Sequence, residues 1–430
     1  MRDKKLPLIF IFITVILDIS GLGIIIPVLP KMISSFTGGN MSTAAAYAGW
    51  LTFAYATVQF FSAPILGNLS DKYGRRPLLL LSLLSFGIDS LFMAFAPSLA
   101  WIFLGRILAG ISGASYTVAS AYVADISTPE KRSENFGLIN AAFGMGFIIG
   151  PVIGGLLGKM GQQVPFLAAA GLSIANFIFG YFVLPESLPL TDRRPFNWKR
   201  ANPVGALMHL RRFPAVAGLL TCITIFYISG HSMETCWTFY TMLKFNWDEQ
   251  MIGISLGASG LIMALVQAVL IRLVLPKTGD RLAVYIGMCF SIIGFVLFAF
   301  AGSGTVMLLT LIPWGLGGLG APAIMGLISN SVPANEQGEL QGGLTSLMSV
   351  TAIPAPLIMS GLFAHYSKPG AEVYFPGAPF LLSAALVLIA LLVAYLSMRH
   401  LPNHFQKPGD EPGLIPETAE TKPGTVKHIA

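Results

Sequence analysis

Residues 67–77 read GNLSDKYGRRP, and this short polar stretch separates two long apolar runs at about residues 47–67 and 78–96. Each run has about 20 residues, which is enough for a helix to cross the ~30 Å hydrocarbon core of a membrane. Gly67 and Gly74 allow the chain to turn tightly between two such helices. The stretch therefore predicts a tight turn between antiparallel membrane helices.

The charged residues of this turn follow a definite order. Asp71 can accept hydrogen bonds from the amides of a helix N-terminus, or pair with Arg75, Arg76 or a basic residue of a neighbouring helix. A solvated loop with basic residues is the simpler alternative. The order Gly, Asp, Gly, Arg, Arg, Pro favours a charged latch that holds one conformation closed.

The composition of the whole chain is that of a membrane protein. Apolar residues make up 54% and charged residues 11% of the 430 residues, whereas soluble domains carry about 25% charged residues. The net charge of +6 is read as membrane topology, and no nucleic-acid partner is expected. Twelve membrane helices are predicted, at about residues 6–28, 47–67, 78–96, 101–121, 136–157, 165–184, 215–240, 251–273, 282–302, 306–328, 342–364 and 380–399.

Basic residues predict the orientation of these helices. If the N-terminus is cytoplasmic, 21 of the 26 Lys and Arg residues lie in cytoplasmic segments. The positive-inside rule then places both termini in the cytoplasm and the protein in the inner membrane as a multi-pass protein.

The polar segments divide the chain. We expect an N-terminal six-helix bundle at 1–184, a basic, proline-containing cytoplasmic linker at 185–214, and a C-terminal six-helix bundle at 215–400. The polar segment 401–430 is expected to be a disordered cytoplasmic tail.

The two predicted bundles share a pattern. An offset of 205 residues carries Lys72, Gly74 and Arg76 onto Lys277, Gly279 and Arg281. The offset favours an ancient duplication. Parallel six-helix repeats around a site at mid-membrane are typical of secondary transporters, so the predicted fold class is an all-α integral membrane protein.

Four motifs resemble those of the major facilitator superfamily. They are the turn at 67–77, LGRILAGISGA at 104–114, GFIIGPVIGG at 146–155 and LDISGLGIIIPVLP at 17–30. With GIDS around Asp89 and VADISTPEKR around Asp125, the sequence is similar to the drug:proton antiporter branch, and within it to the tetracycline efflux pumps. The resemblance implies the major facilitator fold. It also implies that the turn at 67–77, with Gly67, Asp71, Gly74, Arg75 and Arg76, is a gating loop, and that Asp125 belongs with it.

Glycines of the predicted fifth helix recur in the motif at 146–155, which resembles a motif of the drug:proton antiporters. They remove side chains from one helix face, and Pro151 interrupts a backbone hydrogen bond. Ordinary helix packing is the alternative. The resemblance favours a kinked, smooth face between the bundles that seals against leaks, formed by Gly146, Gly150, Pro151, Gly154 and Gly155.

Ionisable residues inside predicted membrane helices mark functional sites. Asp18 and Arg106 belong to helices that line the cavity of the family, and burial and a nearby arginine would act on the protonation of Asp18 in opposite senses. Asp18 is therefore predicted to carry the proton, with a static buried ion pair as the alternative. Asp89 matches an acid of the tetracycline pumps.

The predicted seventh helix adds a departure from the family. Glu234 lies three residues after His231, so the two can form a titratable pair on one helix face; a packing role for His231 is the alternative. A histidine and an aspartate of the tetracycline pumps are replaced here by Met263 and Ser291. The proton route and the substrates can therefore differ from those of the pumps.

Polar and aromatic residues in predicted membrane helices are candidates for the substrate cavity. A drug site is mostly apolar and aromatic with few polar anchors. With His231, the candidates are Tyr55, Gln59, Trp237, Gln267 and Trp314.

These observations predict a proton-coupled antiporter that exports amphiphilic drugs, with tetracycline as a candidate, by alternating access. The alternatives are a proton-coupled transporter of an endogenous metabolite or sugar, and a transport-inactive receptor or scaffold. For the predicted antiporter, the expected partners are a small-molecule substrate, protons and the lipid bilayer. A monomer is expected to be sufficient for transport. The sequence has no Walker A loop and no metal-ligand cluster, so no cofactor, metal or enzymatic activity is predicted.

Overall fold

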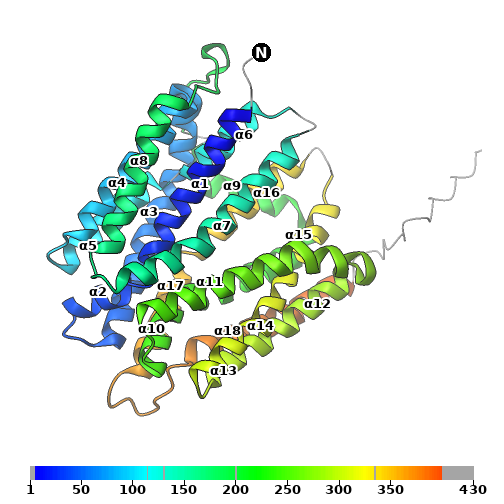
Figure 1. Cartoon of the computed structure of the whole chain (residues 1–430). Helices are drawn as coiled ribbons and strands as arrows, with labels where there is room; N and C mark the ends of the chain where they lie inside the picture. Colours follow the sequence, from blue (N-terminus) through cyan, green and yellow to red (C-terminus); the bar gives the residue numbers. More distant parts are fainter. Residues whose placement is uncertain (1–4, 114, 129–130, 199–200, 334–335, 400–430) are drawn as a thin grey trace, which may run out of the picture.

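The computed structural model describes residues 5–113, 115–128, 131–198, 201–333 and 336–399, and these residues form two bundles of helices (Figure 1). The predicted tail at 401–430 lies outside the described residues. Blue to green helices build the first bundle, and green to red helices build the second. The prediction of an all-helical membrane protein with twelve membrane helices in two six-helix bundles is confirmed.

The first bundle makes six crossings. The fourth crossing, predicted as one helix, is interrupted after Ser112. The helices are α1 (Lys5–Ile25), the short α2 (Leu29–Phe36), α3 (Met41–Tyr73), α4 (Arg75–Ala94), the half-crossings α5 (Leu99–Ser112) and α6 (Ser115–Ile126), α7 (Arg132–Gly158) and α8 (Val164–Val183).

A linker with three short 3-10 turns, η1 (Leu190–Asp192), η2 (Leu210–Arg212) and η3 (Pro214–Val216), and one helix, α9 (Pro203–His209), leads to the second bundle. That bundle contains α10 (Ala217–Phe245), α11 (Glu249–Leu265), the π-helical turn η4 (Val266–Leu270), α12 (Ile271–Phe300), α13 (Gly304–Leu309), α14 (Leu311–Leu316), η5 (Gly317–Leu319), α15 (Gly320–Asn330), α16 (Gln337–Thr351), α17 (Pro354–Ser367) and α18 (Ala378–Arg399).

Hydropathy identifies most of the crossings. In the described residues, eight helical segments are long and apolar enough to span a membrane, and one of them, Glu249–Phe300, has 52 residues and contains two crossings. The remaining crossings are the two short apolar halves α5 and α6, and the long helices α3 and α10 with 33 and 29 residues. At 1.5 Å per residue, α3 is roughly 50 Å long, so it extends beyond the hydrocarbon core.

Local signals set where helices begin and turn. Asn40 Oδ1 accepts a hydrogen bond from the Thr43 amide at the start of α3, and Asp248 Oδ1 accepts one from the Met251 amide at the start of α11. Gly74 (φ 107°, ψ 157°) and Gly279 (φ 71°, ψ 165°) adopt nearly the same conformation, which L-amino acids with side chains rarely adopt. The two turns related by the offset of 205 residues therefore share their geometry.

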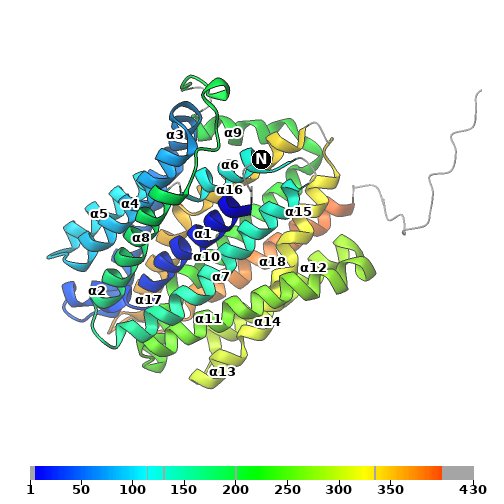
Figure 2. The same ribbon diagram turned by 45° about the horizontal axis from the view of Figure 1, so that its top comes forward.

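The two ends of the molecule differ in how the bundles meet. We call the end that carries the linker the linker side, and the other end the opposite side. Between the bundles, α7 packs along α11 and α3 packs along α17 (Figure 1). In the tilted view of Figure 2, α9 and α16 lie together beside α3 and α6 at the linker side. On the opposite side the bundles are in close contact, where the end of α7 packs against the start of α11.

Candidate functional site

A cavity of about 770 Å³ lies between the bundles. The first bundle supplies most of its wall, from α1, α3, α4, α5, α6 and α7, and the second bundle supplies α16. Asn68, Asp71 and Pro203 line it at the linker side. The charged residues that line it in the described chain are Asp18, Asp71, Asp89 and Arg106, and all four belong to the first bundle. The size and position of the cavity suit a drug-sized molecule.

Asp18 lies in the middle of α1 and is 9% exposed. The Ser115 hydroxyl at the start of α6 donates a short hydrogen bond of 2.5 Å to Asp18 Oδ2. The bond joins α1 to the interrupted fourth crossing, so a shift of α6 changes the surroundings of the carboxylate. A buried carboxylate at the edge of a cavity is poised to exchange a proton when its surroundings change.

Arg106 pairs with Asp89, which differs from the expected constellation of Asp18 with Arg106. The distance from Arg106 Nη2 to Asp89 Oδ2 is 3.6 Å, and the Asp89 side chain is 3% exposed. The reason is the packing of α4 against α5, which places the two side chains face to face. In the described chain, neither Asp89 oxygen nor Arg106 Nε has a hydrogen-bond partner. The Asp89 carboxylate can therefore still accept hydrogen bonds, and Arg106 Nε can still donate one, next to the cavity.

Tyr55 and Gln59 form a polar brace on α3. Gln59 Nε2 donates to the Tyr55 hydroxyl at 3.0 Å and to the Gly113 carbonyl at 2.8 Å. Gly113 lies at the interruption between α5 and α6, so the brace ties α3 to the point at which the fourth crossing breaks. Both side chains line the cavity, as expected of substrate-binding residues.

The candidates from the second bundle are not among the residues that line the cavity. Trp237 is 1% exposed, and its Nε1 donates to Ser255 Oγ at 2.9 Å inside an aromatic core. Trp314 packs against Phe298, and Gln267 is exposed on the π-helical turn. These helices have no single polar face, so the sequence does not reveal which side turns inward.

His231 and Glu234 do form the predicted pair on α10. The distance from His231 Nδ1 to Glu234 Oε2 is 2.8 Å, and the Glu234 side chain is 65% exposed. Neither residue lines the cavity in this conformation. The pair is therefore separate from the cluster formed by Asp18, Asp89 and Arg106.

Hydroxyl residues of α16 also line the cavity, and sequence reasoning did not select them. They are Thr345, Ser346 and Ser349, with Met348 and Ala352 beside them. The i, i+4 spacing of Thr345 and Ser349 was the available signal. It is weak because serine and threonine are common in membrane helices.

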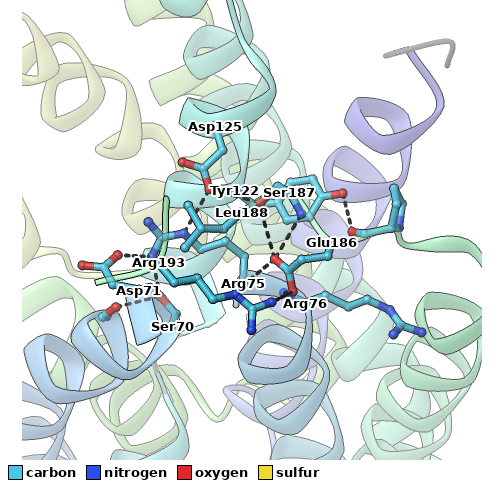
Figure 3. A network of polar contacts seen from close by, with 12 residues as sticks. Ser70, Asp71, Arg75, Arg76, Tyr122, Asp125, Glu186, Ser187, Leu188 and Arg193 are labelled. Carbon is cyan, nitrogen blue, oxygen red and sulfur yellow. Dashed lines mark hydrogen bonds and ion pairs between the residues drawn. The ribbon is translucent and has the colours of Figure 1, made fainter. Parts of the chain in front are cut away.

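The gating loop forms a charged network at the linker side (Figure 3). Arg75 Nη1 lies 2.6 Å from Asp71 Oδ1, and Arg75 Nε donates to Asp125 Oδ2 at 3.1 Å. Arg75 also donates to Ser70 Oγ, while Arg76 Nη2 donates to the Tyr181 carbonyl at 2.6 Å. Asp71, Arg75, Arg76 and Asp125 all belong to the first bundle. In this conformation the network therefore braces that bundle, with Gly74 at its turn and Gly67 at the cavity.

Glu186 completes the network and was not selected from the sequence. Its carboxylate accepts from the backbone amides of Arg75 at 2.8 Å and Arg76 at 3.3 Å, and it lies 3.9 Å from Arg193 Nη2 (Figure 3). It thus caps α4 from the linker. Such a cap has no local sequence signal because it comes from 111 residues away.

Replacing Glu186 by alanine is expected to lower the stability of the first bundle by about 0.5–2 kcal/mol, the usual cost of losing a helix cap. The midpoint of thermal unfolding in detergent measures the change. Glu186→Gln keeps a carbonyl acceptor and should lose less stability. Unchanged unfolding midpoints in both variants would contradict the capping role.

Glycines of α7 face two different partners. Gly146, Gly150 and Gly154 lie against Ile16, Ile19, Ser20 and Ile24 of α1, so they pack within the first bundle and not between the bundles as expected. Gly155 lies against the Glu249 backbone, and the carbonyl of Pro151 lies against Gly253 of α11. Two faces of α7 therefore have different partners: Gly146, Gly150 and Gly154 pack on α1, while Pro151 and Gly155 contact α11 of the other bundle.

Two ion pairs join the bundles next to this contact on the opposite side. Lys31 Nζ lies 2.6 Å from Glu249 Oε1, and the Glu249 side chain is 7% exposed. Lys159 Nζ lies 3.4 Å from Asp248 Oδ2, and both side chains are 49% exposed. The amide of Met251, followed by Lys159 and Lys31, holds the pKa of Asp248 below its ordinary value.

Glu249→Gln is expected to open the opposite side more often than Asp248→Asn does. The Glu249 carboxylate is nearly buried although its partner Lys31 is 45% exposed, whereas both side chains of the Asp248 pair are exposed. A fully exposed pair contributes only about 0–1 kcal/mol, and a buried carboxylate depends more on its partner. The measurement is labelling of Ala63→Cys, a cavity position, by a membrane-impermeant thiol reagent added from the opposite side. Cys289, which is exposed, is replaced by serine in both variants.

The lowered pKa of Asp248 fixes the sign of its pH effect. Its stabilising contribution is present above its ordinary pKa, and it is lost only as the pH falls through the lowered value. Labelling through the Asp248 contact should therefore not change between about pH 5 and pH 8, since Asp248 stays ionised there. Equal labelling of the Glu249→Gln and unmodified proteins would contradict the role of the Lys31–Glu249 pair.

Comparisons with known proteins extend these observations over the whole chain. The family model described as Major Facilitator Superfamily matches residues 11–321 and 241–428. The chain is 39% identical over 384 residues to the class C tetracycline resistance protein of Escherichia coli, which covers 89% of this chain and 95% of that protein. It is 35% identical to the class H tetracycline resistance protein of Pasteurella multocida, over 91% of this chain and 96% of that protein.

Solved structures support the fold. The nucleoside transporter NupG aligns with a TM-score of 0.73 at 14% identity, over 93% of this chain and 100% of that structure. A bacterial homologue of the human lysosomal transporter Spinster aligns with a TM-score of 0.74 at 13% identity, over 93% and 98% of the two chains. At these identities the likeness concerns the fold alone.

Proposed function

The chain belongs to the major facilitator superfamily as a proton-coupled drug antiporter, and we propose that it exports amphiphilic drugs, tetracycline among them, in exchange for protons. The observation that carries the proposal is the buried Asp18 on the wall of a 770 Å³ cavity. The alternative of an endogenous metabolite or sugar as the substrate is not favoured, because several relatives over most of the chain are tetracycline resistance proteins.

The protein is a multi-pass inner-membrane protein, and its linker side faces the cytoplasm in our proposal. The basic residues of the linker and of the loop at 72–76 support this orientation. The cavity then reaches the cytoplasmic end, where Asn68, Asp71 and Pro203 line it, and the Lys31–Glu249 contact closes the periplasmic end. The structure thus corresponds to a state that receives drug from the cytoplasm.

Each charged group has a proposed role in the exchange. Asp18 releases its proton to the cytoplasm when drug enters the cavity and takes up a new one after the periplasmic side opens. Asp89 and Arg106 bind the drug, and their ion pair keeps α4 and α5 in position within the first bundle. Glu234 and His231 form a second titratable pair, outside the cavity of this state, that serves the periplasm-facing state. A ligand that binds the two states unequally shifts their populations, and this coupling drives export.

The gating loop has a proposed role in switching between states. Asp71, Arg75 and Asp125 keep the cytoplasmic end of the first bundle rigid while the cavity is open to the cytoplasm. The bundles, bounded near residues 184 and 215, rock about the cavity as units, and one chain contains the whole cavity. A monomer is therefore sufficient for transport.

Inverted membrane vesicles that are acidic inside test the function. Adding tetracycline should release protons from the vesicle interior, as measured by recovery of fluorescence of a pH-sensitive dye. A panel of amphiphilic drugs and of sugars identifies the class of substrate. Proton release with sugars or metabolites alone would overturn the proposal.

A further inference from the structure

The wall that the second bundle contributes to the cavity is one face of α16. Thr345, Ser346, Met348, Ser349 and Ala352 line the cavity. Residues three and four positions apart lie on one side of a helix, so these side chains form a continuous strip. Thr345 and Ser349 are exposed within this otherwise membrane-embedded bundle, and Met348 is 45% exposed. The strip therefore faces the open space.

The hydroxyl groups of this strip have already used their hydrogens. Thr345 Oγ1 donates to the Gln341 carbonyl at 2.9 Å, and Ser349 Oγ donates to the Thr345 carbonyl at 3.0 Å. Ser346 Oγ donates to the Gly342 carbonyl at 3.0 Å. A hydroxyl has one donor and two acceptor lone pairs. Each of the three groups therefore presents acceptor lone pairs to the cavity.

The opposite wall has a different character. It carries the ion pair of Arg106 and Asp89, the acid Asp18, and the amide of Gln59, whose hydrogens are donated to Tyr55 and Gly113. The two walls thus divide the chemistry between them. Charge and proton exchange belong to the first bundle, and neutral acceptors belong to α16.

The start of α16 is fixed from outside the bundle. Glu339, in the first turn, lies 3.5 Å from Arg212 Nη1 and 3.9 Å from His209 Nδ1, both in the linker. The hydroxyl strip begins less than two turns further along the helix. Its position relative to the cavity is therefore held by contacts separate from the proton site.

We propose that Thr345, Ser346 and Ser349 determine which drugs the protein exports, by accepting hydrogen bonds from hydroxyl, ammonium or amide N–H groups on one edge of the molecule. The inference rests on the proposed function and specifies its substrates: amphiphiles with a donor-bearing edge. A drug that lacks those donors leaves the three acceptors unmatched and binds less tightly.

Substitutions that remove only the hydroxyl groups test the inference. Thr345→Val keeps the shape of the side chain, and Ser349→Ala removes a single oxygen. Substrate-induced proton release in inverted vesicles gives the apparent KM and the maximal rate for tetracycline. It also gives them for a series of analogues that each lack one hydroxyl or ammonium group. Rates are divided by the amount of protein in the membrane.

The expected result is a rise in the apparent KM for tetracycline of about 2–10-fold per hydroxyl, the range that corresponds to one hydrogen bond, with an unchanged maximal rate. For at least one analogue, the variant and the unmodified protein should have the same KM. Thr345→Ser, which keeps the hydroxyl, should restore the KM for tetracycline.

Thr221→Val is the matched control. Thr221 is also exposed and also donates to the carbonyl four residues earlier, Ala217, but it does not line the cavity. Its KM should be that of the unmodified protein.

Three outcomes would overturn the inference. An unchanged KM in both α16 variants, or a KM changed by the same factor for every analogue, would show that the hydroxyl strip does not recognise hydrogen-bond donors of the drug. A lower maximal rate at an unchanged KM would assign α16 a structural role. No proton release by the unmodified protein with any drug would instead overturn the proposed function itself.

Discussion

Asp18→Asn is expected to abolish drug-dependent proton release and to reduce uphill export to the rate of membranes that lack the protein. Asparagine has nearly the same volume, and its amide oxygen can still accept the hydrogen bond from Ser115. It cannot bind and release a proton in the physiological range. The cavity should therefore persist while the coupling between drug and proton is lost.

Two measurements separate the loss of coupling from the loss of the protein. Drug binding to purified Asp18→Asn protein should remain detectable, since the cavity is intact. Asp89→Asn is the comparison: it removes the buried negative charge that pairs with the partly buried Arg106 guanidinium, and breaking a buried pair costs about 3–5 kcal/mol. That variant should lose stability and not only coupling. Proton release that survives Asp18→Asn would contradict the role of Asp18 and would turn attention to Glu234 and His231.

Gly155→Leu is expected to prevent the periplasmic side from closing and to reduce export to the background rate. A Cβ at this position would collide with the backbone of Glu249 and lie 3.1 Å from the Cα atoms of Gln250 and Gly253. These are backbone atoms of α11, so α7 and α11 would have to separate. The cavity reporter Ala63→Cys should then be labelled from the periplasmic side.

Gly144→Leu provides the control on the same helix. A Cβ at Gly144 has no atom within 4 Å in the described chain, so a side chain is accommodated there, and export should be retained. Gly155→Ala should have an intermediate effect, since it adds the smallest side chain. Normal export by Gly155→Leu would show that the close contact of α7 with α11 is not needed for the transport cycle.

The sequence predicted those features that depend on local pattern. Apolar runs of about 20 residues located the crossings, and the glycine at each of two related turns, Gly74 and Gly279, indicated the duplicated architecture. The order of charges in the loop at 67–77 predicted a charged latch that holds one conformation closed. Asp71, Arg75 and Asp125 do form ion pairs, but these lie within the first bundle, and the latch role stays a prediction. The family is confirmed by the comparisons.

The contacts that depend on helix rotation could not be predicted. From the sequence, Arg106 could pair with either Asp18 or Asp89. Only the packing of α4 on α5 selects Asp89. Trp237 and Trp314 lie in helices without a single polar face, so nothing in the sequence distinguishes a cavity face from a core face. Glu186 was missed because its partners, the amides of α4, have no side-chain signature.

The unequal construction of the cavity wall has a consequence for how such a protein can diversify. The groups proposed to handle the proton lie on α1, α4 and α5, whereas α16 contributes neutral side chains of a single helix. Point mutations in α16 can therefore change the substrate specificity without disturbing the proposed coupling to protons. Under a changing antibiotic pressure, we expect heritable variation that alters the resistance spectrum to accumulate on α16, while lineages that change Asp18 are lost.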